Sequence, residues 1–181
     1  MYEEVIEKLR NEGILFSKGL DENEIKKVEN LYNIRFPRDL AAFYKKILPI
    51  SNGFYNWRDF SQENTEKIKK KFLKPQQGIM ANIEEMSWVA EWGVLPSSNM
   101  EKYEIIKSKL KVANLLIPIF GHRYMASQYT EGNPVFSIHG ADVICYGGNL
   151  TQYFMIEFKY EKHSEINYQH LKKVDFWSDL L

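Results

Sequence analysis

The chain has 181 residues, of which 44% are hydrophobic and 27% are charged, a composition typical of a folded protein and not of a disordered one. Twenty-four basic and 24 acidic residues give a formal net charge of zero. The basic excess is small in residues 1–75 (15 against 12), and the acidic excess is small in residues 76–181 (12 against 9). Nucleic-acid-binding domains are usually clearly basic, so we expect no direct nucleic-acid partner.

The single cysteine, Cys145, excludes an internal disulfide and suits a reducing compartment. The N-terminal residues carry charges at helical spacing and lack the apolar core of a signal peptide. No run approaches the roughly 20 apolar residues that a membrane-spanning helix needs. These features predict a cytoplasmic protein without a membrane partner, and the length suits one domain over residues 1–181.

Two amphipathic helices are predicted first in the chain. Residues 2–10 place their apolar side chains on one helical face. The next helix begins at Asp21, which can cap it while Glu24 reaches back in a capping box, and it ends at Asn33. The apolar residues 14–16 between the two helices are predicted to be a connector.

A third helix is predicted after Pro37, a residue that the first helical turn tolerates. Its apolar residues stand at positions 40, 43, 44, 47 and 48, the cleanest amphipathic pattern in the chain. Pro49 is expected to end it, and Ser51-Asn52-Gly53 to turn the chain.

Residues 61–73 predict a weakly amphipathic helix with lysines at positions 67, 69, 70, 71 and 74. These lysines could bind phosphate or acidic groups, but a solvated helix face is the better interpretation because aromatic residues hardly interleave with them. Residues 75–78 predict a loop. The apolar residues between positions 79 and 92 follow neither the helical nor the strand spacing throughout. This segment could form a short helix followed by a strand.

Residues 115–148 carry the strongest strand signals. An apolar run over residues 115–120 predicts a buried strand, and Gly132-Asn133-Pro134 predicts a turn before a hairpin of residues 135–138 and 142–146. A helix capped by Ser97, Ser98 or Asn99 is predicted before this region, and a helix capped by Asn149 after it. The apolar residues near position 177 are expected to dock on the body.

The only cluster that could form a hydrolytic triad is Ser137, His139 and Asp142, and no Gly-x-Ser-x-Gly turn accompanies it. Cys145 lies among apolar residues and is expected to be an inert buried thiol. The four histidines lack the spacing of a metal site. We therefore expect no metal and no cofactor.

Trp88 and Trp92 lie four residues apart beside Glu91, and they could equally line a binding groove or belong to the core. His122, Arg123 and Tyr124 follow the predicted strand of residues 115–120. An arginine at that place either pairs with an internal carboxylate or is presented outward.

Several motifs together resemble those of the SUKH superfamily, which includes the fungal Smi/Knr cell-wall regulators. The N-terminal signature is carried by Gly19-Leu20, Glu24-Ile25, Phe36-Pro37-x-x-Leu40-x-x-Phe43-Tyr44 and Asn52-Gly53. A bacterial branch of the superfamily is resembled by Trp88-x-x-Glu91-Trp92-Gly93, by Ile117-Pro118-Ile119-Phe120-Gly121-His122-Arg123-Tyr124, by Gly132-Asn133-Pro134-Val135-Phe136-Ser137-Ile138 and by Asp142-x-Ile144-x-Tyr146-Gly147.

The resemblance implies a single α+β SUKH-like domain with its core at about residues 19–160. N-terminal helices would pack with a central, mainly antiparallel β-sheet and further helices. It also implies a non-enzymatic immunity protein that neutralises a toxin domain, often a nuclease, of a bacterial polymorphic toxin system. Many such members are acidic, whereas this chain is neutral, which leaves other toxin classes open.

Three functional hypotheses follow. The first is an immunity-type module that binds a toxin, as a monomer or homodimer. The second is a Smi/Knr-like regulatory or scaffold protein with endogenous partners, and the third, remote one is a small hydrolase using Ser137, His139 and Asp142. Aromatic and charged residues are the expected contacts with a protein partner: Arg123, His122, Tyr124, Trp57, Trp88, Trp92 and Glu91.

Overall fold

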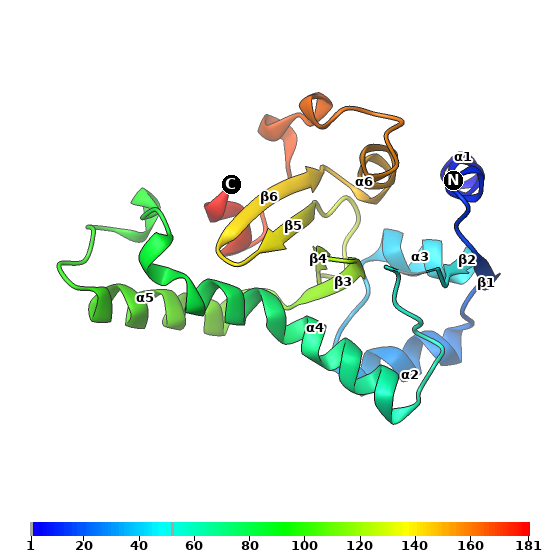
Figure 1. The fold of residues 1–181 in the computed structure, drawn as a ribbon, viewed down its shortest axis with the longest axis horizontal. Helices are drawn as coiled ribbons and strands as arrows, with labels where there is room; N and C mark the ends of the chain where they lie inside the picture. The colour runs from blue at the N-terminus through cyan, green and yellow to red at the C-terminus, as the bar shows by residue number, and fades with distance from the viewer. Residues whose placement is uncertain (1, 52) are drawn as a thin grey trace.

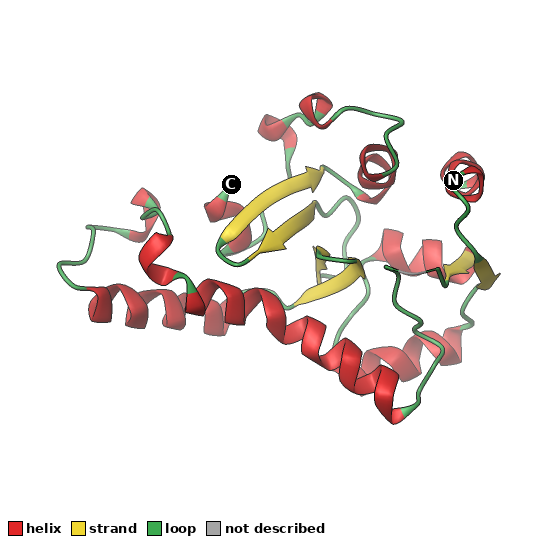
Figure 2. Ribbon diagram, in the orientation of Figure 1, coloured by secondary structure: helices red, strands yellow, loops and turns green. Residues whose placement is uncertain are grey.

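A four-stranded antiparallel sheet with the order β3-β4-β5-β6 lies at the centre of the computed structural model, which describes residues 2–51 and 53–181 (Figure 1). The N-terminal elements gather on the right of Figure 1, and the connection between α4 and α5 forms its left end. Helices and antiparallel strands together make an α+β fold, as predicted (Figure 2). The sheet strands are β3 Leu116–Phe120, β4 Arg123–Ala126, β5 Val135–His139 and β6 Asp142–Gly147.

The N-terminal helices begin where their local signals predict. They are α1 Glu3–Asn11, α2 Glu22–Tyr32 and α3 Arg38–Lys46. The side chain of Asp21 accepts from the backbone N–H groups of Asn23 and Glu24, and Glu24 accepts from the N–H of Asp21, so the predicted capping box is formed. Asn33 adopts a left-handed conformation with φ of 52° and ends α2.

The predicted end of α3 was wrong. Residues 47–49 leave the helix and form β2 (Ile47–Pro49), which pairs antiparallel with β1 (Phe16–Lys18). Residues 14–16 were predicted to be a connector, and their last residue instead begins β1. Pairing gives both short segments backbone partners that a solitary connector would lack. Of the predicted turn at 51–53, Asn52 lies outside the described residues, and Gly53 has a φ of 96°.

The helix predicted over residues 61–73 is longer than expected and continues through the predicted loop, as α4 (Gln62–Ala81) with Pro75 inside it. Pro75 is buried with Ile68, Phe72 and Ile79 on one face of α4, and this burial offsets the backbone hydrogen bond that a proline cannot make. The possible strand within residues 79–92 is not formed. Two single turns, η1 (Ile83–Glu85) and η2 (Ala90–Trp92), lead instead to α5.

The flanking helices of the sheet were predicted correctly by their caps. Helix α5 (Asn99–Val112) starts after Ser98, and α6 (Leu150–Glu157) starts after Asn149, each with a capping side-chain oxygen. Strand β4 was missed: the chain turns at Gly121 and His122, and Arg123 and Tyr124 lie inside a strand and not at a strand exit.

Alternate residues of a strand point to opposite sides of the sheet. Strands β3, β4 and β5 are buried on both sides, whereas β6 exposes Asp142 and Ile144 on one side. Ile117, Ile119, Met125 and Val135 join the cluster that packs against the N-terminal helices and α6. Tyr124, Ala126, Phe136 and Ile138 join a second cluster with α5 and the C-terminal segment. The predicted docking of the tail is confirmed for Val174, Phe176 and Trp177, whereas Leu181 is exposed. The tail contains the single turns η3 His163–Glu165, η4 Tyr168–His170 and η5 Trp177–Leu180.

Candidate functional site

Arg123 braces the sheet and does not face solvent, since only 9% of the residue is exposed. Its Nε donates to Glu157 Oε2 of α6 at 2.8 Å, and its Nη1 donates to Ser137 Oγ of β5 at 2.9 Å. The guanidinium carbon lies 3.9 Å from the centre of the Tyr146 ring on β6. Of the two possibilities that the sequence left open, the structure therefore gives the internal pairing with a carboxylate.

Burial also corrects the expectation for two aromatic candidates. Trp57 and Tyr124 are each 1% exposed. The Trp57 ring lies edge-on to the rings of Tyr32 and Phe36, at 5.7 and 5.4 Å between centroids. Side chains packed inside the core cannot reach a partner protein, so we remove both from the surface candidates. His122 in the β3–β4 turn is exposed and remains one.

The possible triad does not have the geometry of an activated nucleophile. Ser137 is buried, and its hydroxyl accepts a hydrogen bond from Arg123. A nucleophilic serine needs a base within hydrogen-bond reach, and within residues 2–51 and 53–181 no hydrogen bond joins Ser137 to His139. Cys145 is completely buried, and burial raises the pKa of its thiol, as expected of an inert cysteine.

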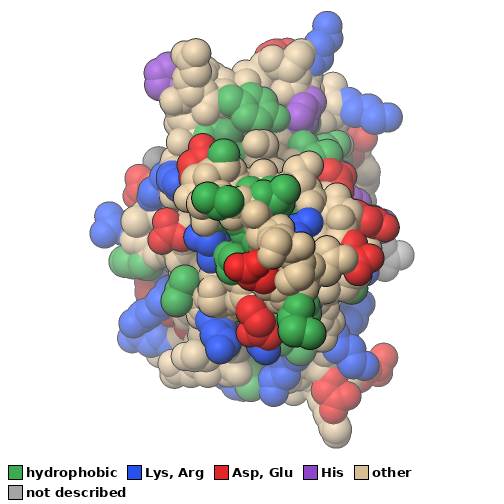
Figure 3. Space-filling model, turned by 90° about the vertical axis from the view of Figure 1, so that its left-hand side faces the viewer, with side chains coloured by type: hydrophobic (Ala, Val, Ile, Leu, Met, Phe, Trp, Pro, Cys, Tyr) green, Lys and Arg blue, Asp and Glu red, His purple; other side chains and the backbone are tan. Residues whose placement is uncertain are grey.

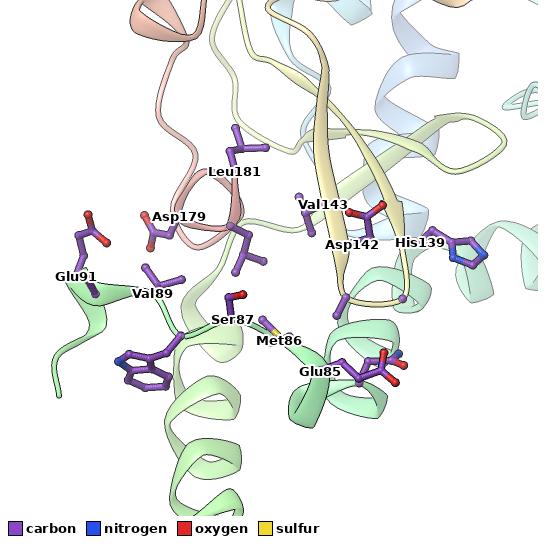
Figure 4. A pocket seen from close by; sticks show the side chains of 16 residues that line it. Glu85, Met86, Ser87, Val89, Glu91, His139, Asp142, Val143, Asp179 and Leu181 are labelled. Atoms are coloured by element: carbon purple, nitrogen blue, oxygen red, sulfur yellow. The ribbon is translucent and has the colours of Figure 1, made fainter. Parts of the chain in front are cut away.

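An open groove of about 870 Å³ lies between the segment of residues 82–91, the β5–β6 turn and the C-terminal residues (Figure 4). Trp88 and Glu91 line it. Figure 4 shows Glu91 and Asp179 on one side of the groove and Asp142 on the other. Sequence candidates and a concave surface coincide at this place.

The two tryptophans have different roles at this groove. Trp92 stacks on Phe176 with 5.3 Å between centroids, and its Nε1 donates to Asp179 Oδ2 at 3.0 Å. It therefore fastens the segment to the C-terminal tail. Trp88 packs edge-on against Trp92 and donates to the carbonyl of Gly93 at 2.7 Å. The rest of the half-buried Trp88 side chain borders the groove.

Carboxylates dominate the charged lining of the groove. Glu85, Glu91, Asp142 and Asp179 line it, and no lysine or arginine of the described chain does. Asp179 is paired with Lys173 at 3.1 Å. The other three carboxylates have no ion pair within the described residues, so the groove attracts cationic groups.

Apolar side chains stand exposed on the loop that continues from this groove and on the first turn of α5. Val94 is 93% exposed, Leu95 61% and Met100 79%. Figure 3 looks at this end of the molecule and shows apolar, acidic and basic side chains interspersed on it. We call residues 82–104, with the groove and these three side chains, the connecting face.

The neutral total charge conceals a sharp local separation. Helix α4 carries five lysines and two glutamates, which is a net charge of +3. Residues 82–104 carry five glutamates and one lysine, which is −4. That lysine, Lys102, is buried and donates to the carbonyl of Met86 at 2.6 Å. Counting charge over short windows would have found this separation, whereas the comparison of chain halves averaged it away.

Comparison with family models, with curated proteins and with solved structures gave no match to this chain. The resemblance to the SUKH superfamily therefore stays a prediction. The described residues contain no cluster of three or more histidine, cysteine or acidic side chains that could hold a metal ion. They also contain no helix with the length and apolarity of a membrane span.

Proposed function

We propose that this chain is a non-enzymatic, protein-binding immunity module that neutralises a cognate polymorphic toxin in the cytoplasm by covering its active surface. The observation that carries the proposal is the connecting face, where exposed Val94, Leu95 and Met100 stand beside an acidic groove. Contiguous exposed apolar side chains rimmed by charge are typical of protein-binding surfaces.

The charge of the connecting face specifies the chemistry of the partner. A basic loop of the toxin would place its cationic side chains in the groove near Glu85, Glu91 and Asp142, and an apolar patch of the toxin would cover the rim. Trp88 borders the groove, where a tryptophan can add a cation–π contact. A toxin domain with a basic active surface, such as a nuclease, therefore fits this protein despite its zero net charge.

A stable complex of this kind buries about 1,200–2,000 Å² in total, and a few central residues supply most of the binding free energy. Trp88 and Leu95 are the strongest choices for such residues. Arg123 would contribute only indirectly, because it holds the sheet together.

The test is co-expression with the toxin encoded by the neighbouring gene. Cells should survive with the unchanged protein and die with a Leu95→Asp variant. Leu15→Asp is the matched control because Leu15 is 66% exposed at a site distant in sequence, and this variant should protect. Death of cells that contain the soluble, folded, unchanged protein would contradict the immunity proposal. Equal protection by both variants would show that the connecting face does not bind the toxin.

A further inference from the structure

A second charged surface lies where α4 meets the turns of the sheet, and His139 and Gly140 of the β5–β6 turn also line the acidic groove. Lys67, Lys71 and Lys74 fall within an arc of about 60° on α4, since successive helical residues are about 100° apart. Gly78 falls on the same arc. A Cβ added at Gly78 would lie 2.7 Å from the carbonyl oxygen of Gly140, so this arc faces the β5–β6 turn.

Two histidines stand beside the lysine arc. His139 precedes Gly140 at the β5–β6 turn, and its ring lies 6.3 Å from that of His122 in the β3–β4 turn. The Nη1 of Arg123 contacts Nε2 of His122. A guanidinium can only donate, so Nε2 accepts and the proton of neutral His122 sits on Nδ1. That N–H has no hydrogen-bond partner among the described residues.

The cations at this place are not balanced locally. None of the α4 lysines forms an ion pair with a described residue. Glu157 forms an ion pair with Arg123. Asp142, opposite His139 in the β5–β6 register, is the one carboxylate brought directly alongside by strand pairing.

We propose that Lys71, Lys74, His122 and His139 form a binding site for a phosphate-type oxyanion, with Lys67 extending it along α4. The lysine ammonium groups would supply charge, and the imidazole N–H groups would supply directed donors. The pKa of His122 is lowered by burial and then by Arg123, His139, Lys71 and Lys74. Burial, Lys74 and Lys67 lower the pKa of Lys71, and a bound dianion would relieve this mutual repulsion of cations. The site does not depend on the proposed toxin-binding function, because Lys71, Lys74 and His122 lie outside the acidic groove and only His139 borders both.

Binding is measured by NMR, following the imidazole signals of His122 and His139 during addition of inorganic phosphate or sulfate, with sodium chloride at equal ionic strength as the reference. A saturable shift is expected with either oxyanion and not with chloride. Sulfate stays a dianion over the titration range of histidine, so it should raise the pKa of His122 measurably. A chloride response of equal size, or a linear response to phosphate up to about 50 mM, would overturn the proposal because it would show screening and not a site.

Matched lysine variants separate the site from general surface charge. The double variant Lys71→Met/Lys74→Met should bind the oxyanion about ten-fold or more weakly than the original protein. Its unfolding midpoint should stay close to that of the original protein. Lys69→Met is the control, since Lys69 is exposed and lies about 160° from Lys71 around α4. Equal weakening by Lys69→Met would overturn the proposal. His139→Gln provides an independent variant outside α4 and should also weaken binding.

The source of the oxyanion is distinguished by repeating the titration with adenosine monophosphate. Affinity equal to that for inorganic phosphate indicates that the site holds the phosphate group alone. Tighter binding indicates a phosphate ester whose organic part also contacts the protein. Either result supports the site, whereas absence of saturable binding by both compounds contradicts it.

Discussion

Two regions that the sequence singled out for the same role have opposite structures. Arg123 and Tyr124 lie in an internal strand, where Glu157, Ser137 and Tyr146 contact the guanidinium and the core covers the tyrosine. Residues 82–104 comprise the connection between α4 and α5 and the first residues of α5, and Val94, Leu95 and Met100 project from them into solvent. The conspicuous side chains of the sheet satisfy their interactions inside the protein, whereas Val94, Leu95 and Met100 of the connecting face remain in solvent.

The largest expected effect on stability is in the buried region. Trp57→Ala should lower the free energy of unfolding by about 3–5 kcal/mol, because the fully buried indole leaves a cavity among aromatic rings. Urea denaturation followed by circular dichroism measures the change. A loss below about 1 kcal/mol would mean that Trp57 is not a core residue.

Arg123→Met should cost about 3 kcal/mol, since it leaves the Glu157 carboxylate buried without its cation. Combining it with Glu157→Leu should recover part of that loss, because the unpaired charge is then gone too. The double-mutant cycle is measured by urea denaturation. If Arg123→Met left stability unchanged and reduced only partner binding, the distinction between the two regions would fail.

The ion pair between Arg58 and Glu24 predicts how stability depends on pH. Hydrogen bonds from the Arg58 side chain, and then from the Asp21 backbone, lower the pKa of Glu24 from 4.5 to about 2. The folded pKa lies below the unfolded one, so this stabilisation is present above pH 4.5 and disappears as the pH falls towards 2. Acidification lowers the free energy of unfolding, and in the Glu24→Gln variant this decrease should be smaller by about 1 kcal/mol. The effect is limited to about this size because the pair is partly exposed. Urea midpoints at several pH values measure this, and an unchanged slope would contradict it.

The smallest effect on stability is expected on the connecting face. Leu95→Asp should change the free energy of unfolding by less than about 0.5 kcal/mol, because the side chain has few contacts to lose. The thermal midpoint should likewise match that of Leu15→Asp. Marked destabilisation would show that the loop packs on the body and is not free for a partner.

The parts of the fold that could be predicted are those with local causes. The capping box of Asp21 and Glu24 and the caps of Ser98 and Asn149 act within four residues, so their helices begin where expected. The two-stranded sheet could not be predicted, because Phe16–Lys18 becomes a strand only by pairing with residues 47–49. Pro75 misled the prediction because its local cost is offset by burial that depends on tertiary packing.

The candidate site could be predicted only in part for the same reason. Trp88 and Glu91 were identified by residue type and do line the groove. The burial of Arg123 depends on Glu157, which follows 34 residues later and is brought near by α6. Val94, Leu95 and Met100 were not among the candidates named from the sequence, and the structure places all three in solvent.

The central claim is that the connecting face, and not the Arg123 region, contacts the partner. Isothermal titration of the purified protein with the catalytic domain of the neighbouring toxin tests it most directly. Leu95→Asp should weaken binding at least about 30-fold, as expected of a central interface residue, while Leu15→Asp leaves it within about two-fold. Equal affinities of the two variants would contradict the claim.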